Sequence, residues 1–208
     1  PLNLVGDYGG GSMTAVVGVL AALIERHSSG RGQVIDAAMV DGVAQLTHAM
    51  WSMRANNRWS DERGVNTFDG SAPFYRCYEC ADGRYVAVGA LEPEFFAELL
   101  SVLGIEPEDV GPQRDVSGWP RMHKLFADKF AQRTRDEWAA TFAGTDACVT
   151  PVLSMAEAVT DPQLKARNVL VEADGRIQPA PAPRFSRTPQ PEPRPNRNVV
   201  SLETLWQD

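Results

Sequence analysis

The sequence predicts a mixed α/β protein, made of part of a large α/β domain and a small α+β domain. Near its start an apolar run enters a glycine-rich segment and then an all-apolar helical stretch, residues 13–24. That order is typical of a strand, a loop and a buried helix. Further along, two aromatic and β-branched runs surround an Asp-Gly dipeptide, which predicts a β-hairpin. A polar stretch separates the two regions, so we expect an α/β part over residues 1–55, a linker over 56–69 and a small domain over 70–168.

The α/β part is expected to hold two strands and two helices. The side chain of Ser12 suits a helix N-cap, and a Ser/Gly-rich turn separates the first helix from the second expected strand. The expected elements are a strand end at Leu4-Val5, a tight loop over residues 6–11, a helix over 13–24, a short strand over 33–37 and a helix over 39–55.

The small domain is expected to combine the hairpin with three helices and an edge strand. A capping box opens its last helix, and a proline inside the last strand favours an edge position. The expected elements are strands over 74–80 and 85–90, helices over 93–103 and 120–132, a helix beginning at Thr134 and a strand over 148–153.

The last segment, residues 169–208, is rich in proline. Seven prolines fall between Pro179 and Pro195, and such a segment builds neither a helix nor a sheet interior. We expect it to run extended over a surface, back toward the first domain, and to end in a docking helix over 202–206.

Composition excludes several classes of protein. The net charge is −7 over 208 residues and the basic residues are scattered, which argues against nucleic-acid binding. The stretch 13–24 is too short and too rich in Gly and Ala for a membrane helix, and the start of the chain lacks the features of a signal peptide. Three cysteines do not make a disulfide framework, so a reducing, cytoplasmic location is expected.

Five motifs occur in an order that resembles the class III CoA-transferase family, and its acyl-CoA racemase branch most. They are Val-Gly-Asp-Tyr-Gly-Gly-Gly at 5–11, Gly-Gln-Val-Ile-Asp-Ala-Ala-Met at 32–39, the hairpin at 80–88, Val-Thr-Pro-Val at 149–152 and Ala-Pro-Arg-Phe-Ser at 182–186. Together they cover essentially the whole chain.

The resemblance implies a Rossmann-like large domain and an interlaced homodimer. The acyl group of an acyl-CoA substrate would lie between the large domain of one subunit and the small domain of its partner. CoA would enter as part of the substrate, so no separate cofactor and no metal is expected, and neither nucleic acid nor membrane is an expected partner.

The resemblance also implies which residues act. In the family's racemases an Asp and a His exchange the α-proton of a 2-methylacyl-CoA through an enolate, and a Glu orients or charges the His. Asp7 matches the Asp and Glu92 matches the Glu. Residues expected to contact substrate are Tyr75, Met39, Gly9 and Gly10.

The family's His lies in a motif upstream of the Asp that this chain does not contain. The three histidines present, His27, His48 and His123, do not match it and suit helix ends or helix surfaces. We therefore expect the chain to be the C-terminal portion of a longer protein and to be inactive alone.

The chemistry explains why such residues would be used. The α-hydrogen of a thioester is weakly acidic, so a base must be held in contact with it and the enolate must be stabilised. Burial against Leu4, Val5 and the first helix would raise the pKa of Asp7 and improve it as a base.

Simpler interpretations stay open for each residue type. Asp7 is also suited to an Asx-turn, the glycines to a tight turn, and Glu92 to the positive end of a helix dipole. Cys77 and Cys80 form a C-x-x-C pair without the second pair that a metal site needs, which favours structural thiols.

Two other functions compete with racemisation. In a CoA-transferase Asp7 would act as a nucleophile that forms a mixed anhydride. The sequence Ala-Leu-Glu-Pro at 90–93, in place of a glycine-rich loop, favours the racemase. Alternatively, the chain could be an inactive dimerisation module that keeps Asp7 and Glu92 as remnants.

Overall fold

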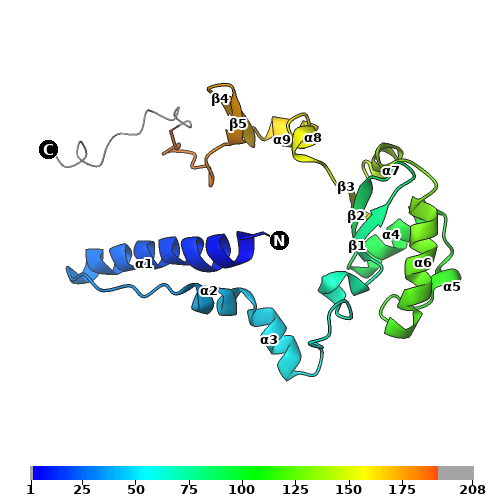
Figure 1. Cartoon of the computed structure of the whole chain (residues 1–208), viewed down its shortest axis with the longest axis horizontal. Helices are drawn as coiled ribbons and strands as arrows, with labels where there is room; N and C mark the ends of the chain where they lie inside the picture. Colours follow the sequence, from blue (N-terminus) through cyan, green and yellow to red (C-terminus); the bar gives the residue numbers. More distant parts are fainter. Residues whose placement is uncertain (1, 192–208) are drawn as a thin grey trace.

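The computed structural model describes residues 2–191 and shows three regions (Figure 1). Helices between residues 4 and 55 form the first region, and a small domain with a three-stranded sheet forms the second. A two-stranded hairpin follows the small domain and leads into the proline-rich segment. The docking helix expected over 202–206 lies outside the described residues.

The chain begins with one continuous helix, Leu4–Ser29, of 26 residues. Its first ten residues, Leu4–Met13, are π-helical (η1), and Thr14–Ser29 is α-helical (α1). The predicted strand end, loop and Ser12 N-cap are therefore wrong. None of the glycines between Leu4 and Met13 has a positive φ. Their role is a close helix contact rather than a turn.

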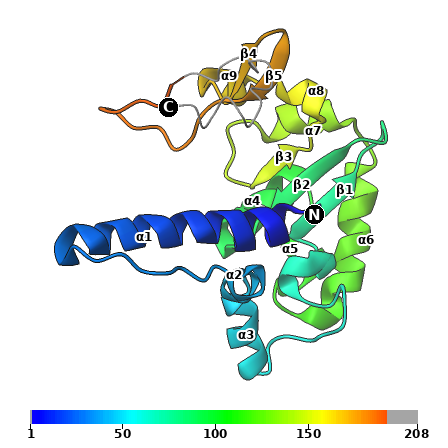
Figure 2. The ribbon, with the colours of Figure 1, turned by 60° about the vertical axis from the view of Figure 1, so that its left-hand side comes forward.

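This helix is long and apolar enough to cross a membrane, by length and composition only. We expected the apolar stretch 13–24 to be too short for this, but the helix that contains it has 26 residues. The helix is longer because the glycine-rich residues before it are also helical. Only 6% of its most apolar window is buried within the described chain, and in Figure 2 α1 projects away from the small domain.

The second predicted helix is two helices. α2 spans Met39–Leu46 and α3 spans His48–Ala55. The Thr47 side chain donates hydrogen bonds to the carbonyls of Val43 and Ala44, both at 3.1 Å. A side chain that bonds to the preceding turn in this way bends a helix, which explains the break.

The strand predicted over 33–37 is wrong. Residues 30–38 have no regular structure, and Val34 is 96% exposed. No strand is described between residues 2 and 74, so 33–37 has no neighbour in that range with which to form a ladder. The described part of the first region therefore shows no Rossmann-like sheet.

A short ordered turn ends the polar stretch that follows α3. η2 spans Thr67–Ser71 and begins with a capping box between Asn66 and Asp69. The Asp69 carboxylate also accepts hydrogen bonds from the N–H groups of Gly64 and Val65, at 3.0 and 3.2 Å. Burial opposes ionisation of Asp69, but the hydrogen bonds from these residues and Asn66 lower its pKa.

The small domain contains an antiparallel sheet in the order β1–β2–β3. The predicted hairpin, three helices and edge strand are confirmed, with bounds shifted by a few residues. The strands are β1 Tyr75–Glu79, β2 Tyr85–Gly89 and β3 Val149–Pro151. The helices are α4 Pro93–Leu103, α5 Pro107–Val110, the 3₁₀ turn η3 Val116–Gly118, α6 Trp119–Phe130 and α7 Arg135–Phe142.

One face of this sheet is buried and the other is open. Tyr78, Val86 and Val88 point into the core, where Phe126 and Phe130 of α6 are fully buried. The alternate residues of the strands, such as Tyr75 and Cys77, are exposed. Helices α4 and α6 lie on the same side of the sheet in Figure 1.

The C-terminal region contains two short helices and a hairpin that sequence analysis did not predict. Their bounds are α8 Met155–Ala158, α9 Pro162–Ala166, β4 Leu170–Ala173 and β5 Arg176–Pro179. The hairpin contradicts the extended course expected from residue 169, whereas residues 180–191 have no helix or strand. Arg184 holds this segment by donating to the carbonyls of Arg167 and Asn168.

Candidate functional site

Asp7 and Met39 form the first part of the candidate site. Asp7 lies on η1 and is exposed, and Met39 is the first residue of α2. A Cβ atom placed on Gly6, the neighbour of Asp7, would lie 3.6 Å from the Met39 sulfur. The structure therefore places the Met39 side chain beside Gly6, the residue that precedes Asp7 in the sequence.

The surroundings of Asp7 are more open than expected. Leu4 and Val5 are 55% and 44% exposed, so the predicted burial of Asp7 is wrong within the described chain. The peptide groups of Asp7 bond locally, with N–H donating to the Asn3 carbonyl and the Asp7 carbonyl accepting from Ser12 Oγ, each at 3.1 Å. No ion pair among residues 2–191 involves its carboxylate.

Gly9 and Gly10 face α2 rather than open space. A Cβ atom on Gly9 would lie 3.1 Å from Cδ1 of Leu46, and one on Gly10 would lie 2.6 Å from Cγ2 of Val43. Gly10 is also the buried residue of η1. These glycines let α2 approach closely, which places Met39 beside the segment that carries Asp7.

The second part of the candidate site lies at one end of the small sheet. Tyr75 of β1 pairs with Gly89 of β2, and the Gly89 N–H donates to the Cys148 carbonyl at 2.9 Å. Glu92 follows three residues later as the N-cap of α4. Tyr75 is held from outside the sheet by Phe68, edge to face, with 5.1 Å between ring centroids.

A groove of about 630 Å³ runs over the open face of the sheet at this end. Its lining includes Phe68, Tyr75, Cys77, Ala87, Gly89 and Cys148. The lining is mostly apolar, as is usual for small-molecule sites. Sequence analysis had selected only Tyr75 from this surface.

The pKa of the Cys148 thiol depends on the charges near this end of the small sheet. Burial raises the pKa of the Cys148 thiol, and the negative charges of Glu92, Asp146 and Glu98 raise it further. Cys148 was not predicted from the sequence, because nothing in the local pattern links it to Glu92, which lies 56 positions earlier.

The structure does not join the two parts of the site. No hydrogen bond or ion pair among the described residues links residues 2–55 to residues 72–191. Asp7 and Met39 thus lie in the first region, and Tyr75 and Glu92 lie in the small domain. A site that uses all four residues would have to bring the first region and the small domain together.

The histidines and cysteines add no metal centre. His27 and His48 are exposed residues of α1 and α3, whereas His123 is half-buried on α6, with its ring centroid 5.6 Å from that of Tyr78. Cys77 is exposed and Cys80 buried, as expected for thiols on different faces. Residues 2–191 contain no cluster of three or more His, Cys, Asp and Glu side chains.

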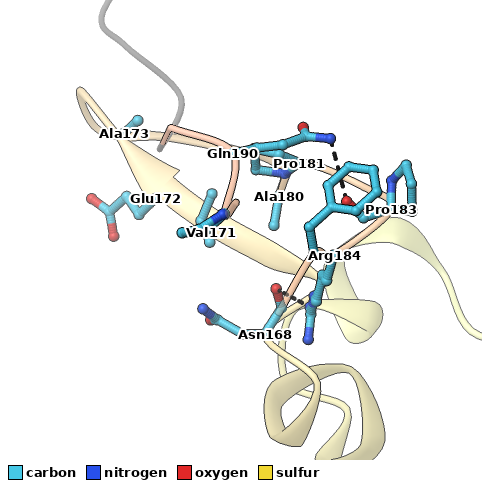
Figure 3. A pocket seen from close by; sticks show the side chains of 11 residues that line it. Asn168, Val171, Glu172, Ala173, Ala180, Pro181, Pro183, Arg184 and Gln190 are labelled. Carbon is cyan, nitrogen blue, oxygen red and sulfur yellow. Dashed lines mark hydrogen bonds between the residues drawn. The ribbon is translucent and has the colours of Figure 1, made fainter. Parts of the chain in front are cut away.

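The C-terminal region has its own groove, of about 600 Å³, far along the chain from Asp7 and Glu92 (Figure 3). Val171, Ala180 and Pro181 line it, with Arg184 and Phe185 on the proline-rich side. None of the predicted site residues contributes to it. Its size therefore does not bear on the chemistry of Asp7 or Glu92.

The glycine-rich first helix and the small domain with one open sheet face are features of a mixed helix-and-sheet protein whose family follows from comparison with known proteins. The chain belongs to CoA-transferase family III, whose model matches residues 2–198. Among curated proteins it is 47% identical to the alpha-methylacyl-CoA racemase of Mus musculus over 190 residues, and 43% identical to that of Homo sapiens. Each alignment covers 91% of this chain and 50% of the relative.

A solved structure has the same fold. The crystal structure of Rv3272 from M. tuberculosis matches 91% of this chain and 49% of its own with a TM-score of 0.68, at 19% sequence identity. The chain therefore spans about half the length of the relatives that it matches. The predicted family membership is confirmed.

Proposed function

We propose that the protein containing this chain racemises 2-methylacyl-CoA thioesters at C2, with Asp7 as one of two proton-transferring groups. The observation that carries the proposal is an exposed Asp7 in a chain that is 47% identical to the mouse racemase. The alignment covers 91% of this chain. Met39 supplies an apolar side chain beside Gly6, in the helix that carries Asp7, and is proposed to contact the acyl group.

The proposed reaction has two proton transfers on opposite faces of C2. The Asp7 carboxylate takes the proton from one face, and the electrons of the C–H bond pass into the enolate of the thioester. A protonated histidine, supplied by protein outside this chain, returns a proton to the other face. In the reverse direction the two groups exchange roles, so the configuration at C2 inverts each time.

Glu92 is proposed to orient this histidine or to favour its charged form. A carboxylate within hydrogen-bond distance of an imidazole stabilises imidazolium. Tyr75 and the apolar groove beside it would contact the acyl chain. Gly9 and Gly10 would act indirectly, because they let α2, which carries Met39, pack closely against the helix of Asp7.

We further propose a homodimer in which the acyl group lies between Asp7 of one subunit and Glu92 of its partner. The separation of the two groups within one chain supports this arrangement. The exposed apolar residues of α1 also support a homodimer, because large exposed apolar patches usually mark protein–protein interfaces. Exposed residues of α1 include Val16, Val17, Val19, Leu20, Leu23 and Ile24.

A CoA-transferase is the second candidate, favoured by the family to which the chain belongs. There the Asp7 carboxylate would attack the thioester carbonyl and form a mixed anhydride, while CoA leaves as its thiolate. The motif at 90–93 carries a glutamate and a proline in place of a glycine-rich loop, which supports the racemase.

The test uses the full-length gene product and measures deuterium uptake at C2 of a 2-methylacyl-CoA. We expect uptake from both epimers in the wild type and in the control Asp41→Asn, which changes an exposed aspartate of α2. In Asp7→Asn we expect uptake to be lost from the epimer whose C2 proton faces Asp7. Incubation with acyl-CoA and hydroxylamine should leave Asp7 unmodified by mass spectrometry. A hydroxamate on Asp7 would establish the transferase instead. Undiminished uptake from both epimers in Asp7→Asn would show that Asp7 transfers no proton and is a remnant.

A further inference from the structure

The position of Glu92 depends on a short backbone segment between β2 and α4. The Leu91 N–H donates to the Gly89 carbonyl at 2.9 Å, and the first helical bond runs from the Phe96 N–H to the Glu92 carbonyl at 3.0 Å. The Glu92 side chain makes no capping hydrogen bond of its own. Glu92 is exposed, so the peptide groups that precede it fix the backbone position from which its side chain extends.

A side chain from elsewhere in the sequence holds these peptide groups. Gln113 Nε2 donates to the carbonyl of Ala90 at 3.1 Å and to the carbonyl of Leu91 at 3.2 Å. Arg114 adds a longer contact, from Nη2 to the Leu91 carbonyl at 3.4 Å. A single half-buried amide thus spans the two residues immediately before Glu92.

Gln113 is itself fixed to the core of the small domain. The backbone carbonyl of Gln113 accepts a hydrogen bond from Trp119 Nε1 at 2.9 Å. Trp119 is 6% exposed, and its ring packs edge to face on buried Phe74, with 5.7 Å between centroids. The chain of contacts therefore runs from a rigid aromatic core through Gln113 to the segment that carries Glu92.

We infer that Gln113 is a positioning residue for Glu92, an inference that rests on the proposed role of Glu92 in racemisation. Catalytic groups must be held within a fraction of an ångström of their working position, and supporting hydrogen bonds do this. Gln113 touches neither substrate nor reacting atoms. It acts only through the backbone that aims the carboxylate.

The chemistry of the amide makes this role specific to glutamine. Its NH₂ group has two donors, one for each carbonyl, whereas a carboxylate at the same place would offer only acceptors. Methionine has a similar length and apolar bulk but donates no hydrogen bond. Gln113→Met therefore removes the two hydrogen bonds while keeping most of the packing.

The experiment compares variants of the full-length gene product by kcat and KM for racemisation and by melting temperature. We expect Gln113→Met and Gln113→Ala to lower kcat about 10- to 100-fold, with KM changed less than about twofold. The control Gln132→Ala removes an exposed amide that donates to the Asp128 carbonyl at 3.1 Å, at the far end of α6. This control should keep wild-type kcat.

The double variant Glu92→Gln/Gln113→Met separates positioning from general damage. If Gln113 acts through Glu92, the double variant will have the kcat of Glu92→Gln alone. Wild-type kcat in Gln113→Met, or a further loss in the double variant equal to the loss in the single one, would overturn the inference. Full activity of Glu92→Gln would instead overturn the proposed role of Glu92.

Discussion

Gly42 of α2 packs directly against the backbone of Gly10 in the first helix. A Cβ atom on Gly42 would overlap the Gly10 carbonyl oxygen, and one on Gly10 would lie 2.9 Å from the Val43 nitrogen. Each of these glycines is the buried residue of its own helix. This contact fixes the distance between the helix of Asp7 and the helix of Met39.

The Gly10–Gly42 contact predicts that Gly42→Ala destabilises the protein. Alanine is the better helix former, so the effect opposes intrinsic propensity. We expect a loss of about 1–3 kcal/mol in the free energy of unfolding, because the two backbones must move apart. Urea unfolding of the full-length gene product, followed by circular dichroism, measures it.

Gly32→Ala is the matched control for this prediction. Gly32 lies in the irregular segment before α2, has no atom within 4 Å of a Cβ placed on it, and has no positive φ. Its replacement should leave the free energy of unfolding nearly unchanged or slightly higher. Equal stabilities of the two variants would show that the helix contact tolerates a methyl group.

A second relationship links α7 to α8. Arg135 is 4% exposed, and its guanidinium donates to both carboxylate oxygens of Glu157, at 3.0 and 2.7 Å, and to the Val152 carbonyl at 3.1 Å. Hydrogen bonds from Arg135, followed by those from Ser154, hold the pKa of Glu157 well below its ordinary value of 4.5.

This lowered pKa predicts acid sensitivity of the small domain. A group with a lowered folded-state pKa stabilises the fold above its unfolded-state pKa, and that stabilisation disappears as the pH falls toward the folded-state value. Glu157→Gln should therefore lower stability at pH 7 and should lose less of it between pH 5 and pH 3 than the wild type. Thermal melts across this range test the difference.

The control for the acid prediction is Glu108→Gln, which changes an exposed carboxylate of α5. It should reproduce the wild-type dependence of melting temperature on pH. Arg135→Ala should cost about 2 kcal/mol at pH 7, because it removes charge-assisted hydrogen bonds. A Glu157→Gln variant as stable as wild type at pH 7 would contradict the prediction.

The small domain was predictable because its signals are local. The Asp82-Gly83 turn, the Thr134 capping box and the stop at Gly104 each fix a boundary within a few residues, and the structure confirms all three elements. Each signal is local: a capping box, a glycine at a helix end and an Asp-Gly turn fix the backbone geometry of the few residues around them.

The first region was less predictable because its glycines serve tertiary contacts. A triple glycine after an apolar run is typical of a turn, but Gly10 serves to admit α2. Likewise, Gln113 reaches the segment before Glu92 from more than 20 positions away. No periodicity or spacing in a single sequence encodes a contact of that kind.

The thiols should react with an alkylating reagent in a defined order. Cys77 and Cys148 are both exposed, but Cys77 should be modified first, because partial desolvation and nearby carboxylates raise the pKa of the Cys148 thiol. Burial also raises the pKa of Cys80, which should react only after unfolding. Mass spectrometry of peptides from timed reactions at pH 7.5 measures the order.

The same labelling tests the proximity of Glu92 to Cys148. Glu92→Gln removes one of the negative charges that raise the Cys148 pKa, so Cys148 should react faster in this variant while Cys77 keeps its rate. An unchanged Cys148 rate would indicate that the carboxylate lies too far away to matter.

If the proposed racemase function holds, Glu92→Gln should abolish most of that activity without unfolding the protein. A glutamine keeps the size of the side chain but cannot stabilise an imidazolium, and the loss of such support typically costs about 100-fold or more in rate. The folded state should be unaffected because the Glu92 side chain caps nothing. Glu94→Gln, which changes an exposed carboxylate in the first turn of the same helix, should keep full activity. If both variants exchange the C2 proton at the wild-type rate, then Glu92 serves only the helix end and the histidine must be held by another residue.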